Sequence, residues 1–425
     1  MNQKKIGKFI ADLRKEKNFT QRELAERLGI SEKTVSKWEC GNGMPEVVYM
    51  EPLCGILGIT VNELLIGEPL NLAELFYKLD RSRLELMKQL EFEELRFRIY
   101  RLYGLEIEQT EISEKGAGSL TYFVTAGNQK YVVKYASDNE MNHPELEPRL
   151  CAYLREHGIP ASEFVKNLQG QVISVDENGR RFHVQKFIAG VTYEYNEAPE
   201  FLFEKAAKLL AKIHMVLQTF DELPEGIGAR FFQYRRPEMM AESFKNTLQI
   251  ALQNGDEENV RDIRTILAVL ERFPRYEFEV SKLTCGNTHG DYMISQLLCE
   301  NNEIKGIIDW TTACRHPLIW EVVRSYIFMA PECKEGRLDV DCFERYLRIY
   351  LTEGGLNAYD IQNAGRLFYY FLAVCDFYGQ YYQSLARNRK IYLEQAKLAK
   401  GMLVWFDEHI DVLDKRLEQL AREYA

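Results

Sequence analysis

Two aspartates in the stretch NTHGDYMISQLLCENNEIKGIIDW, residues 287–310, have a setting suited to phosphoryl-transfer chemistry. Asp291 follows a His-Gly pair in a short loop, where its carboxylate could accept the proton of an attacking hydroxyl. Asp309 ends an apolar run that is typical of a buried strand, and a carboxylate at that place can bind Mg²⁺. The chemistry indicated by these two residues needs a nucleotide site elsewhere in the chain.

Residues that could bind the phosphates of a nucleotide precede this stretch in the expected order. A turn at GAGSLT could bring backbone N–H groups close to phosphate oxygens, and its members are Gly116, Gly118 and Ser119. Lys134 lies within KYVVKYA, where a strand lysine can bind the α- and β-phosphates if a helix carboxylate orients it. Glu147, in the following helical segment, is the expected partner, with Glu145 as the alternative.

The elements that would position these residues can be read from the spacing of apolar residues. The sequence predicts a strand, a Gly-containing turn and a strand over 107–127, a third strand over 130–136, a helix over 145–159 and a strand over 181–190. After about residue 197 the pattern is helical, apart from the stretch at 287–310. The Gly-containing turn, Lys134, Asp291 and Asp309 are each a weak signal, but together, in the chain order that phosphoryl transfer needs, they amount to a strong one.

This constellation resembles the aminoglycoside phosphotransferase family, which has the bilobal protein-kinase fold, over about residues 105–385. Its most specific parts are HGDYMISQ and IIDW. The resemblance implies an α+β domain with a small mixed lobe and a larger helical lobe. The resemblance implies ATP (or another nucleoside triphosphate) and Mg²⁺ as cofactors and an unidentified small molecule as the substrate. It implies a catalytic base, Asp291; metal ligands, Asp309 and Gln296; and nucleotide-binding residues Gly116, Gly118, Ser119, Lys134, Glu147, Gln185 and Phe187, the last two in an adenine-side hinge.

Gln296 is where the sequence departs from the family, which has Asn at this position. Gln has the same carboxamide, but its extra methylene moves the oxygen by roughly 1.5 Å, and a misplacement of that size can cost about a hundredfold in rate. We expect a competent small-molecule kinase; a nucleotide-sensing pseudokinase and an antibiotic-modifying kinase are the alternatives. We expect His289 and Glu321 to support the loop, and His214 to be a packed core residue.

The first 67 residues have the pattern of short capped helices. Thr20 precedes QRELAERLG with Glu23 three residues on, which forms a capping box, and Gly29 ends that helix. Ser31 can cap the next helix, EKTVSKWE, in which Val35 and Trp38 face inward. Two short helices joined by a tight turn are the signature of a helix-turn-helix.

Residues 4–67 resemble the XRE family of phage-repressor-like domains, a five-helix all-α fold, from TQRELAERLGISEKTVSKWECG through to ELLIGE. The resemblance implies contacts with double-stranded DNA. Because a single such domain buries too little interface for tight binding, we expect a homodimer on palindromic half-sites about one helical turn apart. The implied contact residues are Gln21, Ser31, Glu32, Lys33, Thr34, Ser36, Lys37 and Asn42. Residues 1–40 contain ten basic and six acidic side chains, a local excess of four positive charges in a chain whose net charge is −10.

The domains predicted from these patterns are 1–67 for DNA binding, 68–104 for a helical connector, 105–190 for the small lobe and 191–425 for the helical lobe. The connector, with Leu72, Leu75, Phe76 and Leu79 at helical spacing, could pair two subunits or pack on the next domain. Nine scattered cysteines without a Cys/His cluster argue against structural zinc and for a reducing compartment. With no signal peptide or long apolar run, we expect a cytoplasmic protein without a membrane segment.

Overall fold

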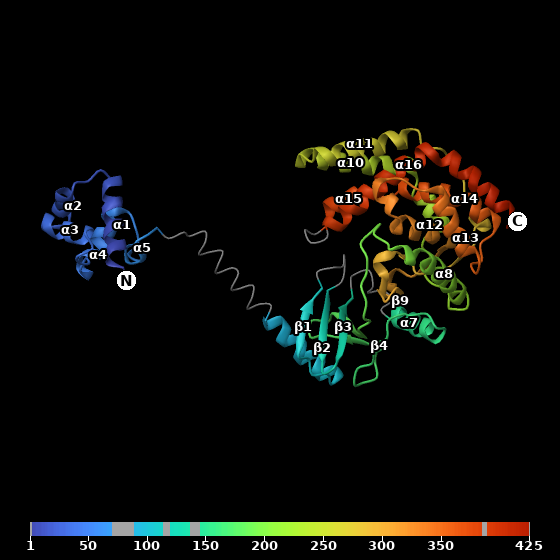
Figure 1. The fold of residues 1–425 in the computed structure, drawn as a ribbon, viewed down its shortest axis with the longest axis horizontal. Helices are drawn as coiled ribbons and strands as arrows, with labels where there is room; N and C mark the ends of the chain where they lie inside the picture. The colour runs from blue at the N-terminus through green and yellow to red at the C-terminus, as the bar shows by residue number, and fades with distance from the viewer. Residues whose placement is uncertain (1, 70–88, 114–119, 137–144, 385–388, 425) are drawn as a thin grey trace. The chain divides into compact units, whose positions relative to one another are not determined.

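The computed structural model describes residues 2–69, 89–113, 120–136, 145–384 and 389–424. The chain divides into two compact units, Met1–Leu95 and Arg96–Ala425 (Figure 1). Among the described residues, no helix combines the length and the apolar composition needed to cross a membrane. The predicted connector residues Leu72, Leu75, Phe76 and Leu79 lie outside the described residues.

The first unit contains the five predicted helices, α1 (Gln3–Glu16), α2 (Gln21–Leu28), α3 (Glu32–Glu39), α4 (Val47–Leu57) and α5 (Val61–Ile66). Thr20 and Glu23 form the predicted capping box at the start of α2, and Gly29 ends α2 with φ 67°. The helices enclose a core that includes Leu24, Val35 and Trp38. The fold therefore follows from local capping and from one apolar face on each helix.

The small lobe of the second unit is built on an antiparallel sheet with the strand order β1-β2-β3-β6-β4, in which β5 also pairs with β6. Its strands are β1 (Gln109–Ile112), β2 (Thr121–Ala126), β3 (Gln129–Tyr135), β4 (Phe164–Val165), β5 (Ile173–Val175) and β6 (Arg181–Lys186). Helix α7 (Leu146–Glu156) follows β3 in the chain. The strands predicted for 107–127, 130–136 and 181–190 are confirmed, with the last one ending at Lys186 instead of Gly190.

Part of the predicted connector packs on the small lobe. Helical residues 96–103 precede β1, and the Arg98 guanidinium donates to the Tyr135 hydroxyl at 2.7 Å and pairs with Glu177 at 2.8 Å. The hydroxyls of Tyr103 and Ser174 lie 2.9 Å apart. These contacts hold residues 96–103 against β3, β5 and the turn after β5. This part of the connector therefore packs on the next domain, which is one of the two alternatives that the sequence left open.

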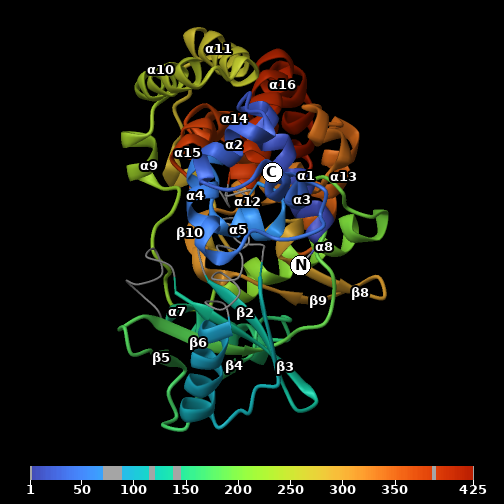
Figure 2. The same ribbon diagram turned by 90° about the vertical axis from the view of Figure 1, so that its left-hand side faces the viewer.

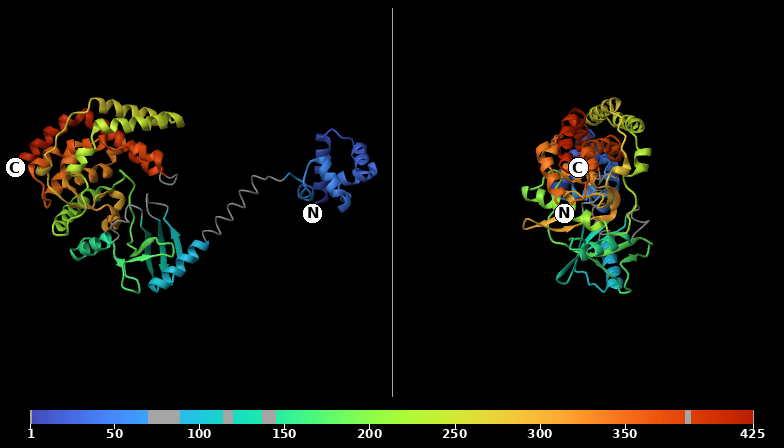
Figure 3. Two further views of the ribbon diagram at one scale, coloured as in Figure 1. Left: turned by 180° about the vertical axis from the view of Figure 1, so that it is seen from behind. Right: turned by 90° about the vertical axis from the view of Figure 1, so that its right-hand side faces the viewer.

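The large lobe consists mainly of helices. They are α8 (Glu200–Leu217), α9 (Ala229–Tyr234), α10 (Pro237–Asn254), α11 (Glu257–Glu271), α12 (Leu318–Met329), α13 (Val340–Leu351), α14 (Ala358–Ala373), α15 (Phe377–Gln383) and α16 (Arg389–Arg422). Helices α10 and α11 lie together at the end of this lobe that is farthest from the sheet (Figures 1, 2 and 3). The aromatic stretch in α14, including Phe368 and Tyr369, is buried as core.

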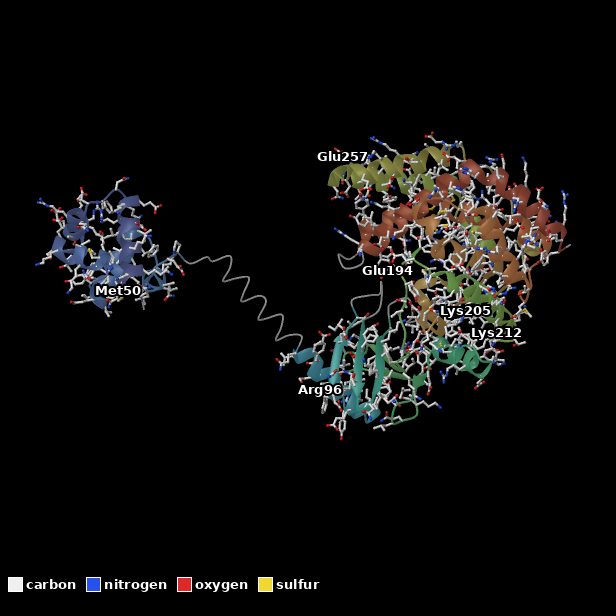
Figure 4. The ribbon with its side chains drawn as sticks, viewed as in Figure 1. Met50, Arg96, Glu194, Lys205, Lys212 and Glu257 are labelled. Atoms are coloured by element: carbon white, nitrogen blue, oxygen red, sulfur yellow. The ribbon has the colours of Figure 1, made fainter. Side chains whose placement is uncertain are left out.

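Two small two-stranded sheets interrupt the helices of the large lobe. Strands β8 (Leu297–Glu300) and β9 (Glu303–Ile307) form one, and β7 (Cys285–Thr288) pairs with β10 (Cys314–Pro317) in the other. The expectation of helix after residue 197 was therefore incomplete, because β10 is too short to give an alternating pattern. The Lys205 ammonium, labelled in Figure 4, donates to the Asn302 carbonyl at 2.8 Å and joins α8 to the β8–β9 turn.

Candidate active site and DNA-reading helix

Asp291 lies in the loop between β7 and β8, and the backbone of this loop has little freedom. Gly290 has φ 81°, and a Cβ added there would lie 2.0 Å from the carbonyl oxygen of Thr312. Only glycine fits this position, because a side chain would collide with backbone. The loop is therefore pressed against the segment that follows Asp309.

His289 orients this loop through both ring nitrogens. Its Nε2 lies 3.0 Å from the carbonyl oxygen of Ile308, so Nε2 must be the donor, and Nδ1 accepts from the backbone N–H of Asp291 at 3.3 Å. The ring is fully buried and lies 4.4 Å from that of Trp310, measured between centroids. Both nitrogens are thus occupied by the backbone on either side of the site, which agrees with the expected supporting role.

Glu321 on α12 supports the loop that contains Asp291 by accepting hydrogen bonds from its backbone. Its buried carboxylate accepts hydrogen bonds from the backbone N–H groups of His289 (3.2 Å) and Tyr292 (3.4 Å) and from Nε2 of His214 (2.9 Å). Burial by itself disfavours the charged form, but the hydrogen bond and charge of His214 outweigh it and lower the pKa of Glu321 to about 2. His214 is buried and also contacts the Tyr350 hydroxyl at 2.7 Å, so it is the core residue that the sequence predicted.

Asp309 lies two residues after β9, in a backbone conformation that favours a functional explanation. Its φ is 62°, which is uncommon for a residue other than glycine. Its Oδ1 accepts from the Lys134 ammonium at 2.9 Å and from the Thr311 hydroxyl at 2.8 Å. Desolvation opposes ionisation, but the charge and hydrogen bond of Lys134, together with Thr311, lower the pKa of Asp309.

The structure therefore brings the predicted lysine and the predicted metal ligand together. Lys134 projects from β3 of the small lobe, and Asp309 belongs to the large lobe. Glu147 on α7 is buried and accepts from the backbone N–H of Trp310 at 3.2 Å, so it reaches the residue next to Asp309. Its ion pair with Lys134 remains a prediction.

Gln296 contacts Asp291 and the residue that precedes Asp309. Its Nε2 donates to Oδ2 of Asp291 at 3.4 Å, and its backbone carbonyl accepts from the N–H of Ile308 at 3.1 Å. The nitrogen faces Asp291, which leaves the amide oxygen available for a cation. Among the described residues there is no cluster of three or more His, Cys, Asp or Glu side chains that could hold a metal ion. One carboxylate and one carboxamide suit Mg²⁺, which takes few ligands from the protein, and the binding of Mg²⁺ by Asp309 and Gln296 remains a prediction.

The predicted hinge residues lie at the end of β6. Gln185 is buried, and its side-chain nitrogen contacts Nε2 of His183 at 3.0 Å. His183 accepts there as a neutral ring, because burial and the nearby charge of Lys134 lower its pKa to about 3. The Phe187 ring packs edge-on against Phe123, with centroids 5.9 Å apart. The residues of the predicted phosphate-binding turn, Gly116, Gly118 and Ser119, lie outside the described residues.

Arg324 is a site residue that the sequence analysis missed. Its guanidinium donates to Oδ1 of Asp291, and its side chain is 9 % exposed. A signal was present in the sequence, because Glu321 and Arg324 are the two charged residues in the otherwise uncharged helix LIWEVVRSYIFM. A buried charge is normally paired, so a partner could have been sought.

The DNA-reading candidates lie on and around α3 in the first unit. Ser31 caps α3 through the backbone N–H of Thr34 at 3.2 Å, while Glu32, Lys33 and Lys37 are exposed. Ser36 is partly exposed, and Asn42 is exposed just after the helix. A short capped helix that presents polar and basic side chains is suited to the major groove.

Gln21 makes an internal contact that the sequence did not indicate. Arg14 and Glu39 form a largely buried two-point ion pair at 2.6 and 3.0 Å, and the Gln21 amide donates to Glu39 at 2.7 Å. The amide nitrogen of Gln21 is thus engaged within the domain, and its contact with a DNA phosphate remains a prediction.

Comparisons with known proteins match both units. The model of the phosphotransferase enzyme family matches residues 109–358, and a helix-turn-helix family model matches residues 10–64. The first unit is similar to the HTH-type transcriptional activator BcrR of Enterococcus faecalis, with 42 % identity over 61 residues, 14 % of this chain and 30 % of that protein. The second is similar to the homoserine kinase of Methylobacillus flagellatus, with 24 % identity over 207 residues, 49 % of this chain and 59 % of that enzyme.

Solved structures show the same fold for the second unit. The amicoumacin kinase hAmiN, in complex with AMP-PNP, Ca²⁺ and Ami, aligns with a TM-score of 0.51 and 14 % identity, over 79 % of this chain and 99 % of that one. A microcompartment-associated aminopropanol kinase aligns with a TM-score of 0.52 and 13 % identity, over 77 % and 99 %. The expected bilobal α+β fold beside an all-α helix-turn-helix domain is therefore confirmed.

Proposed function

The chain belongs to the phosphotransferase enzyme family and also contains a helix-turn-helix DNA-binding domain, and from this premise we propose that it is a transcription regulator whose second unit transfers the γ-phosphoryl group of ATP to a small-molecule hydroxyl or amine. The observation that carries the proposal is the convergence of Lys134, Asp291, Gln296 and Asp309 from separate segments of the chain. Lys134, Asp291 and Asp309 have the side chains that their proposed roles in phosphoryl transfer require, and Gln296 offers the same carboxamide as the Asn of the family.

In the proposed reaction Asp291 accepts the proton of the acceptor group. The acceptor oxygen or nitrogen then bonds to the γ-phosphorus, the bond from that phosphorus to the β,γ-bridging oxygen breaks, and ADP leaves with the electron pair. Lys134 would exchange its contact with Asp309 for the α- and β-phosphates. Asp309 and Gln296 would bind Mg²⁺, which neutralises charge on the phosphates when it is present.

The acceptor is proposed from the relatives. A homoserine kinase covers about half of this chain, although the chain spans only 59 % of that enzyme, and it supports a small amino alcohol as the first class to test. Tyr195 lies near the proposed base, because the charges of Asp291 and Arg324 act on its phenol, although burial contributes most to raising the pKa of Tyr195. Glu194, labelled in Figure 4, is exposed beside it and would suit a cationic amine on the acceptor.

A second candidate is a regulator whose kinase-like unit binds nucleotide without turnover. It is favoured by Gln296 in place of Asn and by the pairing of both aspartates with intrachain cations. Transfer from γ-labelled ATP to a pool of amino alcohols, sugars and antibiotics separates the two. The kinase predicts transfer by the wild-type chain that is lost in Asp291→Asn and Asp309→Asn. Binding of ATP with no transfer above the Asp291→Asn control would support the sensor.

DNA recognition is proposed to involve two copies of the first unit on palindromic half-sites, about one helical turn apart. The exposed polar and basic residues of α3 support this, as does the similarity to BcrR, which is a transcriptional activator. Selection from a random duplex pool at low salt tests it. A pool that yields no enriched sequence would remove sequence-specific reading from the proposal.

A further inference from the structure

Arg324 makes a contact with the proposed base that stability alone does not explain. Its guanidinium donates to Asp291 Oδ1 from within the buried helix α12. Its Nε is buried and has no hydrogen-bond partner among the described residues. A buried charge with so few partners is costly, and a well-packed apolar side chain would often be at least as stable in its place. The arginine is therefore better explained by what it does to Asp291.

The guanidinium is fixed in place by aromatic side chains of its own helix. Its central carbon lies 4.4 Å from the ring centroid of Phe328 and 5.5 Å from that of Trp320. Guanidinium groups stack on aromatic faces, and a planar, fixed donor orients a carboxylate better than a flexible ammonium does. The ring of Tyr195, in the segment between β6 and α8, packs edge-on against Phe328 with centroids 5.2 Å apart, so Phe328 is itself packed in place.

Asp291 is thereby contacted at both oxygens. Arg324 occupies Oδ1, and the Gln296 amide approaches Oδ2 at the longer distance of 3.4 Å. The side chain of Asp291 is 26 % exposed, so an acceptor can still reach it. Oδ2 therefore has the weaker intrachain contact. An acceptor group could approach Oδ2 by displacing the Gln296 amide.

We propose that Arg324 is a positioning residue for phosphoryl transfer, which fixes Asp291 through Oδ1 so that Oδ2 faces the acceptor. The inference rests on the proposed kinase function. Helix α12 then acts on the loop twice, because Glu321 binds its backbone and Arg324, one turn further on, binds its reactive side chain. This role predicts an effect on turnover with little effect on nucleotide binding, since Arg324 contacts the base and not the residues assigned to the phosphates.

The test measures transfer, ATP affinity and folded fraction for the full chain with Arg324→Ala and Arg324→Lys. Arg366→Ala is the matched control, because Arg366 is also a partly buried arginine of the large lobe and pairs with Asp414 at 2.7 Å. We expect Arg324→Ala to lower kcat by about a hundredfold, the scale of a misplaced catalytic group, and to leave ATP affinity within about twofold. Arg324→Lys should retain more activity, and millimolar methylguanidine should raise kcat of Arg324→Ala at least about tenfold without affecting Arg366→Ala.

The outcomes separate the inference from the function on which it rests. If the wild-type chain transfers phosphate but Arg324→Ala loses no more kcat than Arg366→Ala, the positioning role is refuted. It is also refuted if the loss follows the folded fraction and methylguanidine restores nothing. Should Arg324→Ala fail to fold, the comparison of kcat between Arg324→Lys and the control decides in the same way. A wild-type chain no more active than Asp291→Asn overturns the kinase proposal itself, and this inference with it.

Discussion

Replacement of Glu321 by Gln tests whether one carboxylate orders the catalytic loop. Its Oε2 accepts from both His214 and the His289 backbone, and its Oε1 accepts from the Tyr292 backbone. A Gln side chain has one oxygen and one NH₂ group, so at least one of these three buried donors loses its acceptor and meets another donor instead. Glu321→Gln is therefore nearly isosteric but chemically mismatched.

The magnitude follows from the contact that is lost. A hydrogen bond to a charged group contributes about 1.5–3 kcal/mol, and the lower part of that range applies because the Tyr292 contact is long, at 3.4 Å. A loss of about 2 kcal/mol corresponds to roughly thirtyfold faster exchange of the loop amides, at about 1.4 kcal/mol for each factor of ten. The amides of His289 and Tyr292 should show it in hydrogen–deuterium exchange of a peptide that spans residues 286–296.

The matched control is Asp360→Asn, which alters a second buried carboxylate in the same lobe. Asp360 accepts from the backbone N–H groups of Thr284 at 2.8 Å and of Asn357 at 2.9 Å. In the part of the chain that the structure describes, these partners lie outside residues 289–292. It should destabilise the lobe with a smaller effect on the loop amides. If the 286–296 peptide exchanges equally fast in both variants, or is unchanged in Glu321→Gln, the ordering role of Glu321 is wrong.

The other predictions concern the nucleotide, the metal, pH and DNA. Lys134→Ala should weaken ATP–Mg²⁺ binding by about tenfold or more, measured calorimetrically, because a charge-assisted hydrogen bond is lost; an unchanged Kd would contradict the phosphate site. Gln296→Asn should give no gain in kcat, because the shorter side chain falls roughly 1.5 Å short in this loop; a clear gain would show that the loop is not adapted to Gln. Burial lowers the pKa of His316 to about 4 and that of His183 to about 3, below the ordinary 6.5. Below pH 6.5 the unfolded chain therefore binds protons that the native chain does not. Each of the two histidines should lower the free energy of unfolding by about 1.4 kcal/mol for each pH unit, down to about pH 4. Urea midpoints that fall equally steeply with pH after His316→Gln would oppose this. Lys37→Ala should weaken specific DNA binding by about 1 kcal/mol while Val35→Asp unfolds the first unit, because Val35 is core and Lys37 is exposed; gel-shift titration and circular dichroism distinguish the two effects.

The parts of this protein that could be predicted from sequence are those determined by local signals. The capping box at Thr20, the left-handed Gly29 and the inward face of α3 depend on residues only a few positions apart, and all are present. The approach of Lys134 to Asp309, 175 residues later, was expected because the order of four motifs implied a known fold. Without that resemblance, no spacing rule would have joined them.

What could not be predicted depends on contacts between distant residues or on very short elements. Strand β10 has four residues and ends at a proline, so no alternation of polar and apolar residues reveals it. The pair of Arg324 and Asp291 joins residues 33 positions apart, and local sequence does not choose among the many acids that a buried arginine could meet. The contact between Gln21 and Glu39 also joins residues far apart in the sequence. Through it, an amide that was expected to contact DNA donates to a carboxylate of its own domain.

The substitution of Gln for Asn at position 296 is understood best together with Arg324. Gln296 has contacts beyond those that a metal ligand needs. Its side-chain nitrogen contacts Asp291, and its backbone carbonyl accepts from the N–H of Ile308, the residue before Asp309. The longer side chain can reach the base from this position, and Arg324 secures the other oxygen of the same carboxylate. The shorter side chain of an Asn at position 296 would not reach Oδ2, so that Arg324 alone would hold Asp291 before the acceptor binds. The two residues therefore make one arrangement, and a double-mutant cycle of Gln296→Asn and Arg324→Lys on kcat should show losses that are less than additive. Strictly additive losses would mean that Gln296 and Arg324 act on the reaction independently.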